Sequence, residues 1–220
     1  MATSQLRRTR EQELIAATRA LFDERGLQDA PIDEIARNVG IARGLVYRVF
    51  SSKEELYVLT VTDYLRELDG LLREAIAPGV DFVDQLERWG RTFAGFCQRY
   101  PAFLDCALSL MRRPAPELHD MVSESVWFRL GQGIGSCVHH VSQLLADGTA
   151  AGVFTVEDPD FTAHVLWTQT LGTMHLARSG VGVKQIAPEI PALFTIAPEQ
   201  VVETCVSSAL QVVRAGRPGR

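Results

Sequence analysis

Apolar residues recur at helical spacing in separate stretches of this chain, and each stretch ends close to a glycine or a proline. One such stripe, with apolar residues at i, i+3, i+4 and i+7, begins at Ile32 and stops before Gly40, a residue type that commonly ends helices. Ser51 and Ser52 are each followed three residues later by glutamate, a capping-box pattern that predicts another helix start. The N-terminal quarter is therefore predicted to form four helices. The first opens with a capping box at Thr9 and Gln12 and stops at Gly26, and the second runs from Ile32 to Val39. The third follows Ile41 and buries Val46, Val49 and Phe50, and the fourth starts at Ser51-Ser52 and breaks at Pro78-Gly79.

From residue 80 onward the chain keeps its helical period, and prolines stand near the starts or ends of the stretches. No stretch alternates with period two as a half-buried strand would, and no repeat of 20–50 residues is visible. The segment 179–197 has little helical period and several glycines and prolines, which favours a loop. The sequence thus predicts an all-α protein, with later helices at 81–99, 102–112, 117–146, 158–178 and 198–214.

The composition favours a protein that folds around an apolar core. Hydrophobic residues make up 46% of the 220 residues, so folding needs neither a metal nor a disulfide. The four cysteines show no CxxC or metal-ligand spacing, which indicates reduced, partly buried thiols in a cytosolic protein. The N-terminus lacks the apolar segment of a signal peptide, and no apolar run approaches the ~18 residues of a membrane span. We therefore expect a cytoplasmic location.

The net charge of −5 argues weakly against a nucleic-acid binder, but the charge is unevenly distributed. Residues 1–57 hold nine arginines and lysines against nine acidic residues, so the whole excess of acid lies further along the chain. The first ten residues contain Arg7, Arg8 and Arg10 and no acid. Because phosphate contacts act over about a Debye length, the charge of one face matters more than the sum.

The second and third predicted helices form a helix-turn-helix pattern, because a tight turn that contains Gly40 joins them. In such proteins the N-terminal part of the second helix enters the DNA major groove. Arg43 and Arg48 are placed to reach phosphates or guanine edges, and Gly44 allows close backbone approach. Tyr47 suits a phosphate oxygen. Lys53 lies in the first turn of the next helix, where the dipole disfavours a cation, so a phosphate contact explains it better.

A solvated surface is the alternative interpretation of these side chains. Helix–turn–helix patterns also arise by chance, and Lys53 could simply pair with Glu54 or Glu55. The combination of order, spacing and capping over about 50 residues favours DNA binding.

Residues 9–57 resemble the DNA-binding domain of the TetR family of bacterial transcriptional regulators. The family's apolar, glycine, aromatic and lysine positions occur here at the same offsets and without a gap. The resemblance covers roughly a quarter of the chain, and the remainder is similar to the family in length, helicity and order of helices. The matching residues are Ile35, Ala36, Val39, Gly40, Ile41, Gly44, Tyr47, Phe50, Lys53, Glu54 and Leu56.

Three positions depart from the family pattern. Ala30-Pro31 stands where a threonine or serine usually precedes the second helix, and Ala42 stands where serine usually caps the reading helix. Alanine is a poor cap, by about 0.5–2 kcal/mol relative to serine. Leu45 replaces a frequent threonine and could contact a thymine methyl group. These changes affect which operator sequence is expected, and they leave the expected fold unchanged.

The resemblance implies three parts: a DNA-binding domain at 1–57, a connecting helix at 58–79, and a larger helical domain at 80–220 that binds a ligand and forms the dimer. It implies double-stranded operator DNA as the partner. We expect the DNA contacts to come from the reading helix, the start of the helix after it and the N-terminal arginines: Arg8, Arg10, Arg43, Gly44, Leu45, Tyr47, Arg48, Ser52 and Lys53.

The larger domain has aromatic and sulfur side chains that could line an apolar effector pocket, although each is also an ordinary core residue. Few acids lie in the middle of these helices, so a mostly apolar or aromatic small molecule is expected. Adjacent His139 and His140 point to different sides of a helix, and no histidine pair has metal-ligand spacing, so no metal is predicted. The candidate pocket residues are Phe93, Phe96, Phe103, Met111, Trp127, Phe128, Trp167 and, as a polar anchor, His175.

The last two predicted helices are expected to form a homodimer with two-fold symmetry, because they carry small residues that allow close packing. Two reading helices held one turn of DNA apart can then bind a palindromic operator. The interface candidates are Thr170, Thr173, Ser208, Ala209 and Val212.

These features predict a ligand-responsive transcriptional regulator, a repressor that its effector releases from DNA. An interaction or architectural protein with a vestigial helix-turn-helix is one alternative, and an enzyme is another. The sequence contains no nucleophile elbow, Walker loop or HExxH motif, so neither enzymatic activity nor a cofactor is predicted. The protein is expected to associate with the nucleoid when it is bound to DNA.

Overall fold

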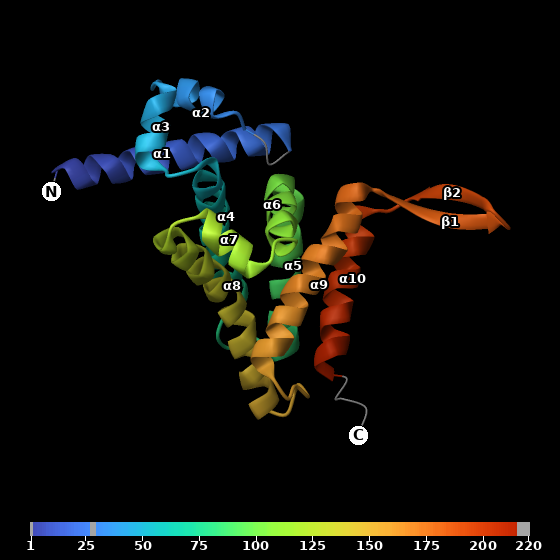
Figure 1. Ribbon diagram of the computed structural model, residues 1–220. Helices are drawn as coiled ribbons and strands as arrows, with labels where there is room; N and C mark the ends of the chain where they lie inside the picture. Colours follow the sequence, from blue (N-terminus) through green and yellow to red (C-terminus); the bar gives the residue numbers. More distant parts are fainter. Residues whose placement is uncertain (1, 27–29, 215–220) are drawn as a thin grey trace. The chain divides into compact units, whose positions relative to one another are not determined.

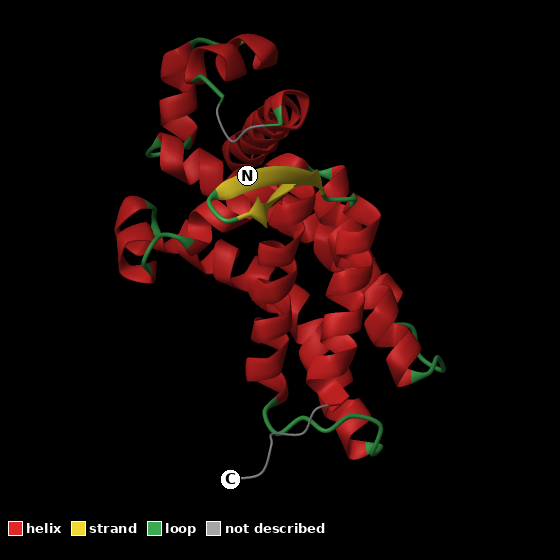
Figure 2. Ribbon diagram, turned by 90° about the vertical axis from the view of Figure 1, so that its right-hand side faces the viewer, coloured by secondary structure: helices red, strands yellow, loops and turns green. Residues whose placement is uncertain are grey.

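A computed structural model describes residues 2–26 and 30–214, and these ranges are almost entirely helical (Figures 1 and 2). The all-α prediction is confirmed. Among the described residues, no helix combines the length and apolarity needed to cross a membrane. The elements are α1 (Ala2–Arg25), α2 (Ile32–Val39), α3 (Arg43–Val49), α4 (Lys53–Ala75), α5 (Phe82–Arg99), α6 (Pro101–Met111), α7 (Ala115–Met121), α8 (Glu124–Ala150), α9 (Pro159–Ser179), β1 (Val181–Ala187), β2 (Ile190–Thr195) and α10 (Pro198–Arg214).

The chain divides into two compact units. The first comprises Met1–Glu67 and Tyr100–Ile134, and the second comprises Leu68–Arg99 and Gly135–Arg220. Helices α4 and α8 each contribute residues to both. The boundaries predicted after residues 57 and 79 are not the ones that separate these units, and they stay a prediction about functional parts.

Helices α1, α2 and α3 pack on one another in the first unit. The chain enters α2 through Pro31, whose extended conformation (φ −63°, ψ 132°) sets the direction of the helix. The helix ends at Gly40, which has a φ of 71°, and the Ile41 N–H then donates to the Ala36 carbonyl at 2.9 Å. This turn fixes α3 relative to α2. The side chains buried between these helices include Leu14, Phe22, Ile35, Val46 and Phe50.

The start of α4 is capped by the Ser52/Glu55 pair, as predicted. Ser52 Oγ accepts a hydrogen bond from the Glu55 N–H (3.0 Å), and the Glu55 carboxylate accepts one from the Ser51 N–H (2.8 Å). The other Glu55 oxygen accepts from the Ser123 N–H (3.1 Å), directly before α8. Burial alone would raise the pKa of Glu55, but the hydrogen bonds from Ser123 and Ser51 keep that pKa below its usual value. The Glu55 carboxylate therefore accepts hydrogen bonds at the starts of both α4 and α8.

Glu55→Gln is expected to lower the free energy of unfolding by about 1–3 kcal/mol at pH 7, because the neutral amide is a weaker acceptor than the carboxylate. The folded-state pKa of Glu55 is depressed. Its contribution is therefore present above the unfolded pKa of roughly 4.3 and is lost as the pH falls through the folded pKa. Urea unfolding at pH 7 and at about pH 3 should show the difference between wild type and variant shrinking in acid. Glu54→Gln, one residue earlier, is the control, and an equal loss in both variants would contradict this assignment.

The core of the second unit lies where α5, α9 and α10 pack against one another. The rings of Phe93 and Trp167 stack with centroids 4.3 Å apart, and Trp89 meets Phe93 edge-on at 5.8 Å. Helix α10 approaches α5 closely, since a Cβ atom on Gly90 would lie 3.3 Å from Val206 Cγ2. This aromatic layer is the centre of the unit.

The prediction of a loop at 179–197 is wrong, because β1 and β2 form an antiparallel hairpin there. The strands escaped the periodicity search because their large side chains are exposed instead of alternating between core and solvent. The turn at Pro188-Glu189 also lacks the Asn-Gly signal of a hairpin. Glu189 has a φ of 63°, which with the preceding proline fits a type II turn.

Two helix boundaries also differ from the sequence prediction. The stretch predicted as one helix at 117–146 forms α7 and α8, which are separated at Val122-Ser123. Helix α1 begins at Ala2, so Thr9 does not cap it. The Thr9 hydroxyl instead donates to the Gln5 carbonyl within the helix (3.1 Å). Side-chain capping patterns therefore located the start of α4 but not that of α1.

Candidate nucleic-acid interface

Helix α3 has one buried side and one exposed side. Val46 and the adjacent Phe50 are buried and hold the helix against α1 and α2. The five α3 residues predicted to read DNA are all exposed: Arg43, Gly44, Leu45, Tyr47 and Arg48. The fold thus leaves this surface open while fixing the helix that carries it.

Arg43 is held in place by neighbours on α2 and α3. Its guanidinium lies 3.1 Å from the Asp33 carboxylate and 6.0 Å from the centre of the Tyr47 ring. Hydrogen bonding with Tyr47 and the charge of Asp33 raise the pKa of Arg43. Because both members of the ion pair are well exposed, a phosphate can replace Asp33 at little expense in energy.

The predicted contacts at the start of α4 have different surroundings. Ser52 is half-buried, and its hydroxyl oxygen is used to cap α4. Lys53 is exposed in the first turn of the same helix. Ser52 therefore has a structural role in addition to its candidate role at the interface.

The arginines predicted on α1 lie in a charged environment. Arg10 pairs with Glu13 on the same helix (2.9 Å). Arg8 lines a cavity of about 300 Å³ together with Glu11, Asp63, Arg66 and Arg129. Glu11 and Arg129 form an ion pair of 2.7 Å there. Acidic side chains thus accompany both arginines.

The reading helix starts without a side-chain cap. Ala42 occupies the cap position in an extended conformation (φ −73°, ψ 143°) and makes no side-chain hydrogen bond. Ala42→Ser is therefore expected to raise the free energy of unfolding by about 0.5–2 kcal/mol, because the hydroxyl can accept from a free N–H of the first turn. Urea unfolding measures the change. Ala42→Val adds bulk without an acceptor, and an equal gain in that variant would disprove the capping explanation.

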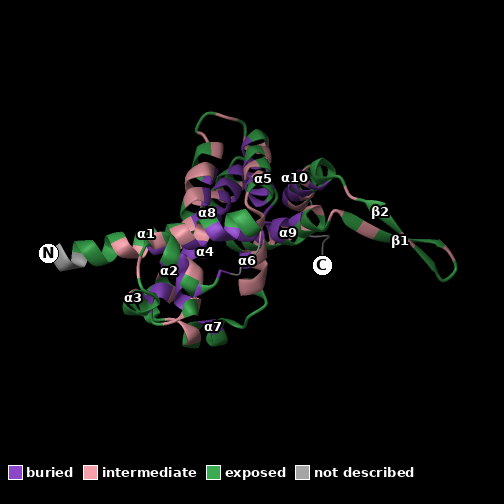
Figure 3. Cartoon of the chain, turned by 90° about the horizontal axis from the view of Figure 1, so that it is seen from above, coloured by how far each residue is buried: buried purple, intermediate pink, exposed green. Residues whose placement is uncertain are grey.

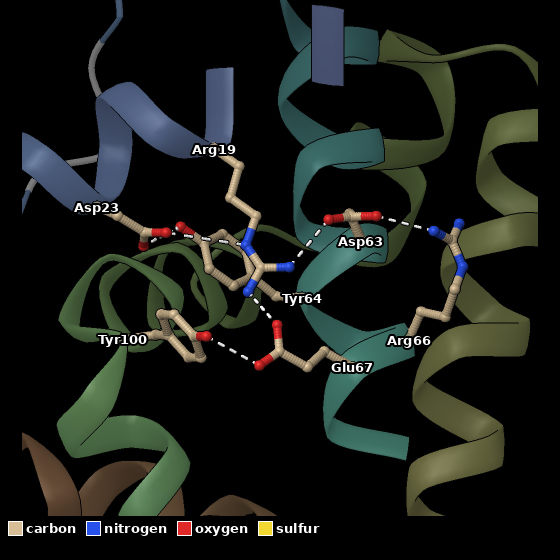
Figure 4. A network of polar contacts seen from close by, with 7 residues as sticks. All are labelled: Arg19, Asp23, Asp63, Tyr64, Arg66, Glu67 and Tyr100. Atoms are coloured by element: carbon tan, nitrogen blue, oxygen red, sulfur yellow. Dashed lines mark hydrogen bonds and ion pairs between the residues drawn. The ribbon is translucent and has the colours of Figure 1, made fainter. Parts of the chain in front are cut away.

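A polar cluster around Arg19 joins α1 to α4 and α6 (Figure 4). The Arg19 guanidinium donates to Asp63 at 2.9 Å and to Glu67, both on α4. It also lies over the rings of Tyr64 and Tyr100, at 4.2 and 4.9 Å from their centres. The cluster therefore holds α1, which packs on α2 and α3, against α4, which follows α3 in the chain.

Further hydrogen bonds complete the Arg19 cluster. The Tyr64 hydroxyl donates to Asp23 (2.6 Å), and the Tyr100 hydroxyl donates to Glu67 (2.8 Å). Burial alone would lower the pKa of Arg19, but the hydrogen bonds to Asp63 and Glu67 raise it. This cluster was not predicted because its members are far apart in the chain, and only the Asp63–Glu67 spacing of one helical turn indicated a shared face.

The candidate effector residues belong to both compact units. In the second unit Phe93, Phe96 and Trp167 are buried and His175 is exposed. In the first unit Phe103 is buried, Trp127 is half-buried, and Met111 and Phe128 are exposed. The sequence analysis overlooked Trp89, whose buried indole N–H has no hydrogen-bond partner among the described residues. A cavity of about 690 Å³ in the second unit is lined by other residues: Thr155, Val156, Glu157, Asp158, Phe161, Thr162 and Val212.

The candidate dimer residues lie on α9 and α10, which pack on each other within the chain. Thr170 and Ala209 are buried inside the single chain, and the Thr170 hydroxyl donates to the Leu166 carbonyl at 2.8 Å. Thr173, Ser208 and Val212 are half-buried. The interface stays a prediction, and the half-buried residues are the better candidates for it.

Comparisons with known proteins agree with this arrangement. Residues 14–59 match the model of the bacterial regulatory proteins of the tetR family. The chain is 37% identical over 78 residues to the transcriptional repressor KstR2 of Rhodococcus jostii, a match that covers 36% of this chain and 38% of that protein. It is 25% identical over 153 residues to the transcriptional regulator YhgD of Bacillus subtilis, covering 70% and 75% of the two chains. The chain thus spans well under half of KstR2 and three quarters of YhgD.

The fold is similar to that of solved regulators over nearly the whole chain. The structure of RolR in complex with resorcinol superposes with a TM-score of 0.69 at 17% identity, covering 96% of this chain and 91% of RolR. Both curated relatives are named as transcriptional regulators of the helix-turn-helix type. The family model accounts for the helix-turn-helix, and the fold comparison accounts for the remaining helices. The helix-turn-helix of this chain, residues 14–59, therefore matches the tetR family of bacterial regulatory proteins, and the fold of the chain is similar to that of solved members of that family.

Proposed function

We propose that the protein is a transcriptional repressor that binds a palindromic operator as a homodimer and is released from it by a small, mostly apolar effector. The exposed side of α3 carries this proposal. Arginine, tyrosine and glycine are exposed there on a short helix whose other side is anchored in the core. This is the composition that phosphate and base contacts in a major groove require. The naming of KstR2 as a repressor supports the sign of the regulation.

Base preference is assigned to Arg43, Leu45 and Arg48, and positioning on the backbone to Gly44, Tyr47, Ser52 and Lys53. Leu45 is exposed near the start of the reading helix, where an aliphatic side chain suits a thymine methyl group. Selection of binding sites from random DNA should therefore change at one position when Leu45 is replaced by alanine. An unchanged preference would remove Leu45 from the set of reading residues.

The effector is assigned to the aromatic layer of the second unit, around Phe93 and Trp167. The unpartnered indole N–H of Trp89, which packs on Phe93, favours an effector that offers a hydrogen-bond acceptor beside an apolar body. The resorcinol complex of RolR supports a small aromatic compound of this kind. Release requires the effector to bind the free protein more tightly than the operator-bound protein, since only differential affinity shifts an equilibrium. Equal affinities by calorimetry would exclude this mechanism.

Fluorescence anisotropy with the promoter region of the protein's own gene tests the central claim. We expect binding to weaken steeply with salt, because phosphate contacts release counterions, and to prefer this promoter to unrelated DNA of equal length. The location required is the cytoplasm, where the chromosome is accessible. Binding that does not discriminate between the two DNAs would instead indicate an architectural protein.

A further inference from the structure

The hairpin formed by β1 and β2 exposes an unusual amount of apolar surface. It extends beyond the ends of α9 and α10 (Figure 1), and most of it is exposed (Figure 3). The charged residues of segment 180–197 are Lys184 and Glu189. Six large apolar side chains in the hairpin are exposed by 43–71%: Val181, Val183, Ile186, Ile190, Leu193 and Phe194.

The hairpin is a built element with a fixed register. Val183 pairs with Leu193 across the strands, and the Ile196 N–H closes the base on the Gly180 carbonyl at 3.0 Å. The Phe194 ring covers Gly182 so closely that a Cβ atom there would lie 2.4 Å from it. Cross-strand partners point to the same side, so Val181, Val183 and Leu193 form one apolar face without a charge. This order would serve no purpose in a simple linker between two helices.

The exposed apolar area of the hairpin indicates whether another surface covers it. A fully exposed side chain of this size presents roughly 150–200 Å², so the six together present on the order of 600 Å², divided between the two faces of the hairpin. Contiguous apolar patches of a few hundred Å² on ordinary monomers are often functional. Two-stranded hairpins are also only marginally stable alone in water. The hairpin therefore favours a state in which another surface covers it.

The chemistry of the hairpin selects the partner. A nucleic acid or an anionic membrane would require a cluster of cations, and the segment offers Lys184 alone. Uncharged apolar surface is typical of permanent homodimers. Two-fold symmetry doubles the contribution, since each subunit gives an arm and receives one. Each subunit would bury the apolar face of its own arm and the surface that receives the partner's arm, and both add to the contribution of α9 and α10 toward the roughly 800 Å² per partner that a stable interface buries.

We propose that β1 and β2 form a dimerisation arm whose apolar face packs on a second copy of this chain. The arm is the direct connection between α9 and α10, the helices assigned to the dimer above, so it continues the same surface. This inference rests on the homodimer of the proposed function and adds the element that secures it. The arm explains why an apolar hairpin with defined register stands where a short loop would connect the helices.

Sedimentation of the full-length protein tests the arm through the double variant Val183→Lys/Leu193→Lys. Both side chains are about 70% exposed in the single chain, so the substitutions should leave its far-ultraviolet circular dichroism almost unchanged. In the dimer they would bury two ammonium groups. We expect the dimer dissociation constant to rise at least 100-fold. Lys184→Gln removes the hairpin's cation but no apolar surface, and it should change the constant less than threefold.

A photo-crosslinker attached at Val183→Cys identifies what the arm touches. All four native cysteines are buried, and burial raises the pKa of Cys205 to about 11 and those of Cys106 and Cys137 to about 12, so the new thiol should react selectively. We expect a covalent dimer of twice 24.3 kDa, with the crosslink between chains. Crosslinks exclusively within one chain would overturn the proposal.

The outcomes separate the arm from the proposed function. If the Val183→Lys/Leu193→Lys variant remains as dimeric as the wild type, the proposal of a dimerisation arm is wrong. That result would not contradict the proposed function if the same samples still bind operator DNA. If the wild type is monomeric at all concentrations, both the arm and the homodimer are wrong. Binding of wild type to neutral phosphatidylcholine vesicles, lost in the double variant without any change in dimerisation, would assign the hairpin to a membrane and also overturn the proposal.

Discussion

Replacing Arg19 with methionine is expected to lower the free energy of unfolding by about 2–4 kcal/mol at neutral pH. The Arg19 side chain is only 15% exposed and meets Asp63, Glu67 and, at 3.8 Å, Asp23. Methionine preserves much of the aliphatic stem but removes the charge. The carboxylates then repel one another without a cation, in a site from which water is partly excluded. Urea unfolding followed by circular dichroism measures the loss.

Arg66→Met provides the matched control, because Arg66 also pairs with Asp63 (2.8 Å) but its side chain is 67% exposed. Exposed ion pairs contribute about 0–1 kcal/mol, so this variant should remain close to wild type. Arg19→Lys should lie near Arg19→Met, since one ammonium cannot bridge two carboxylates as a guanidinium does. Equal losses in the Arg19 and Arg66 variants would show that burial does not distinguish the two pairs.

The double variant Arg43→Ala/Arg48→Ala is expected to weaken operator binding by a factor of roughly 30 to 10⁴. Each arginine that reaches a phosphate or a guanine edge contributes about 1–3 kcal/mol. Arg43 and Arg48 are both exposed, so their removal should change the stability of the protein by less than about 1 kcal/mol. Anisotropy titrations at several salt concentrations separate the two kinds of contact. The salt slope falls by about one for each lost phosphate contact, whereas a lost base contact relaxes sequence preference.

Arg66→Ala/Arg112→Ala removes the same charge from exposed positions on other helices and is the control for general electrostatics. We expect its operator affinity to fall by less than about fivefold at physiological salt, since screening limits distant charges. A similar loss in both double variants would mean that net charge, and not the reading helix, drives binding.

The helix-turn-helix could be predicted from the sequence because its determinants are local. Gly40 takes the positive φ that ends α2, and Ser52 caps α4 through Glu55, as the spacing indicated. The apolar stripe of α2 became its buried side. The exposed residues of α3 followed from the same period, since positions that do not face the core face outward.

The Arg19 cluster and the hairpin were not predictable in this way. Arg19 meets partners 44 and 48 residues away, and no periodicity connects positions so distant in sequence. The strands carry apolar side chains on exposed surface, which contradicts the burial that pattern reading assumes. The predicted effector residues stay a prediction, because aromatic residues at helical spacing indicate burial but not which of them line a pocket.

The sequence by itself determined the helices, the turn between α2 and α3 and the chemistry of the reading surface, because caps, turns and amphipathic faces depend on residues a few positions apart. Only the tertiary structure decided that α1 is held against α4 through one partly buried guanidinium, and that an apolar hairpin stands exposed between α9 and α10. Those two features depend on which distant segments meet and which surfaces stay uncovered. That information lies in the packing of the whole chain, because a contact between distant segments forms only where it is compatible with the other contacts of the fold.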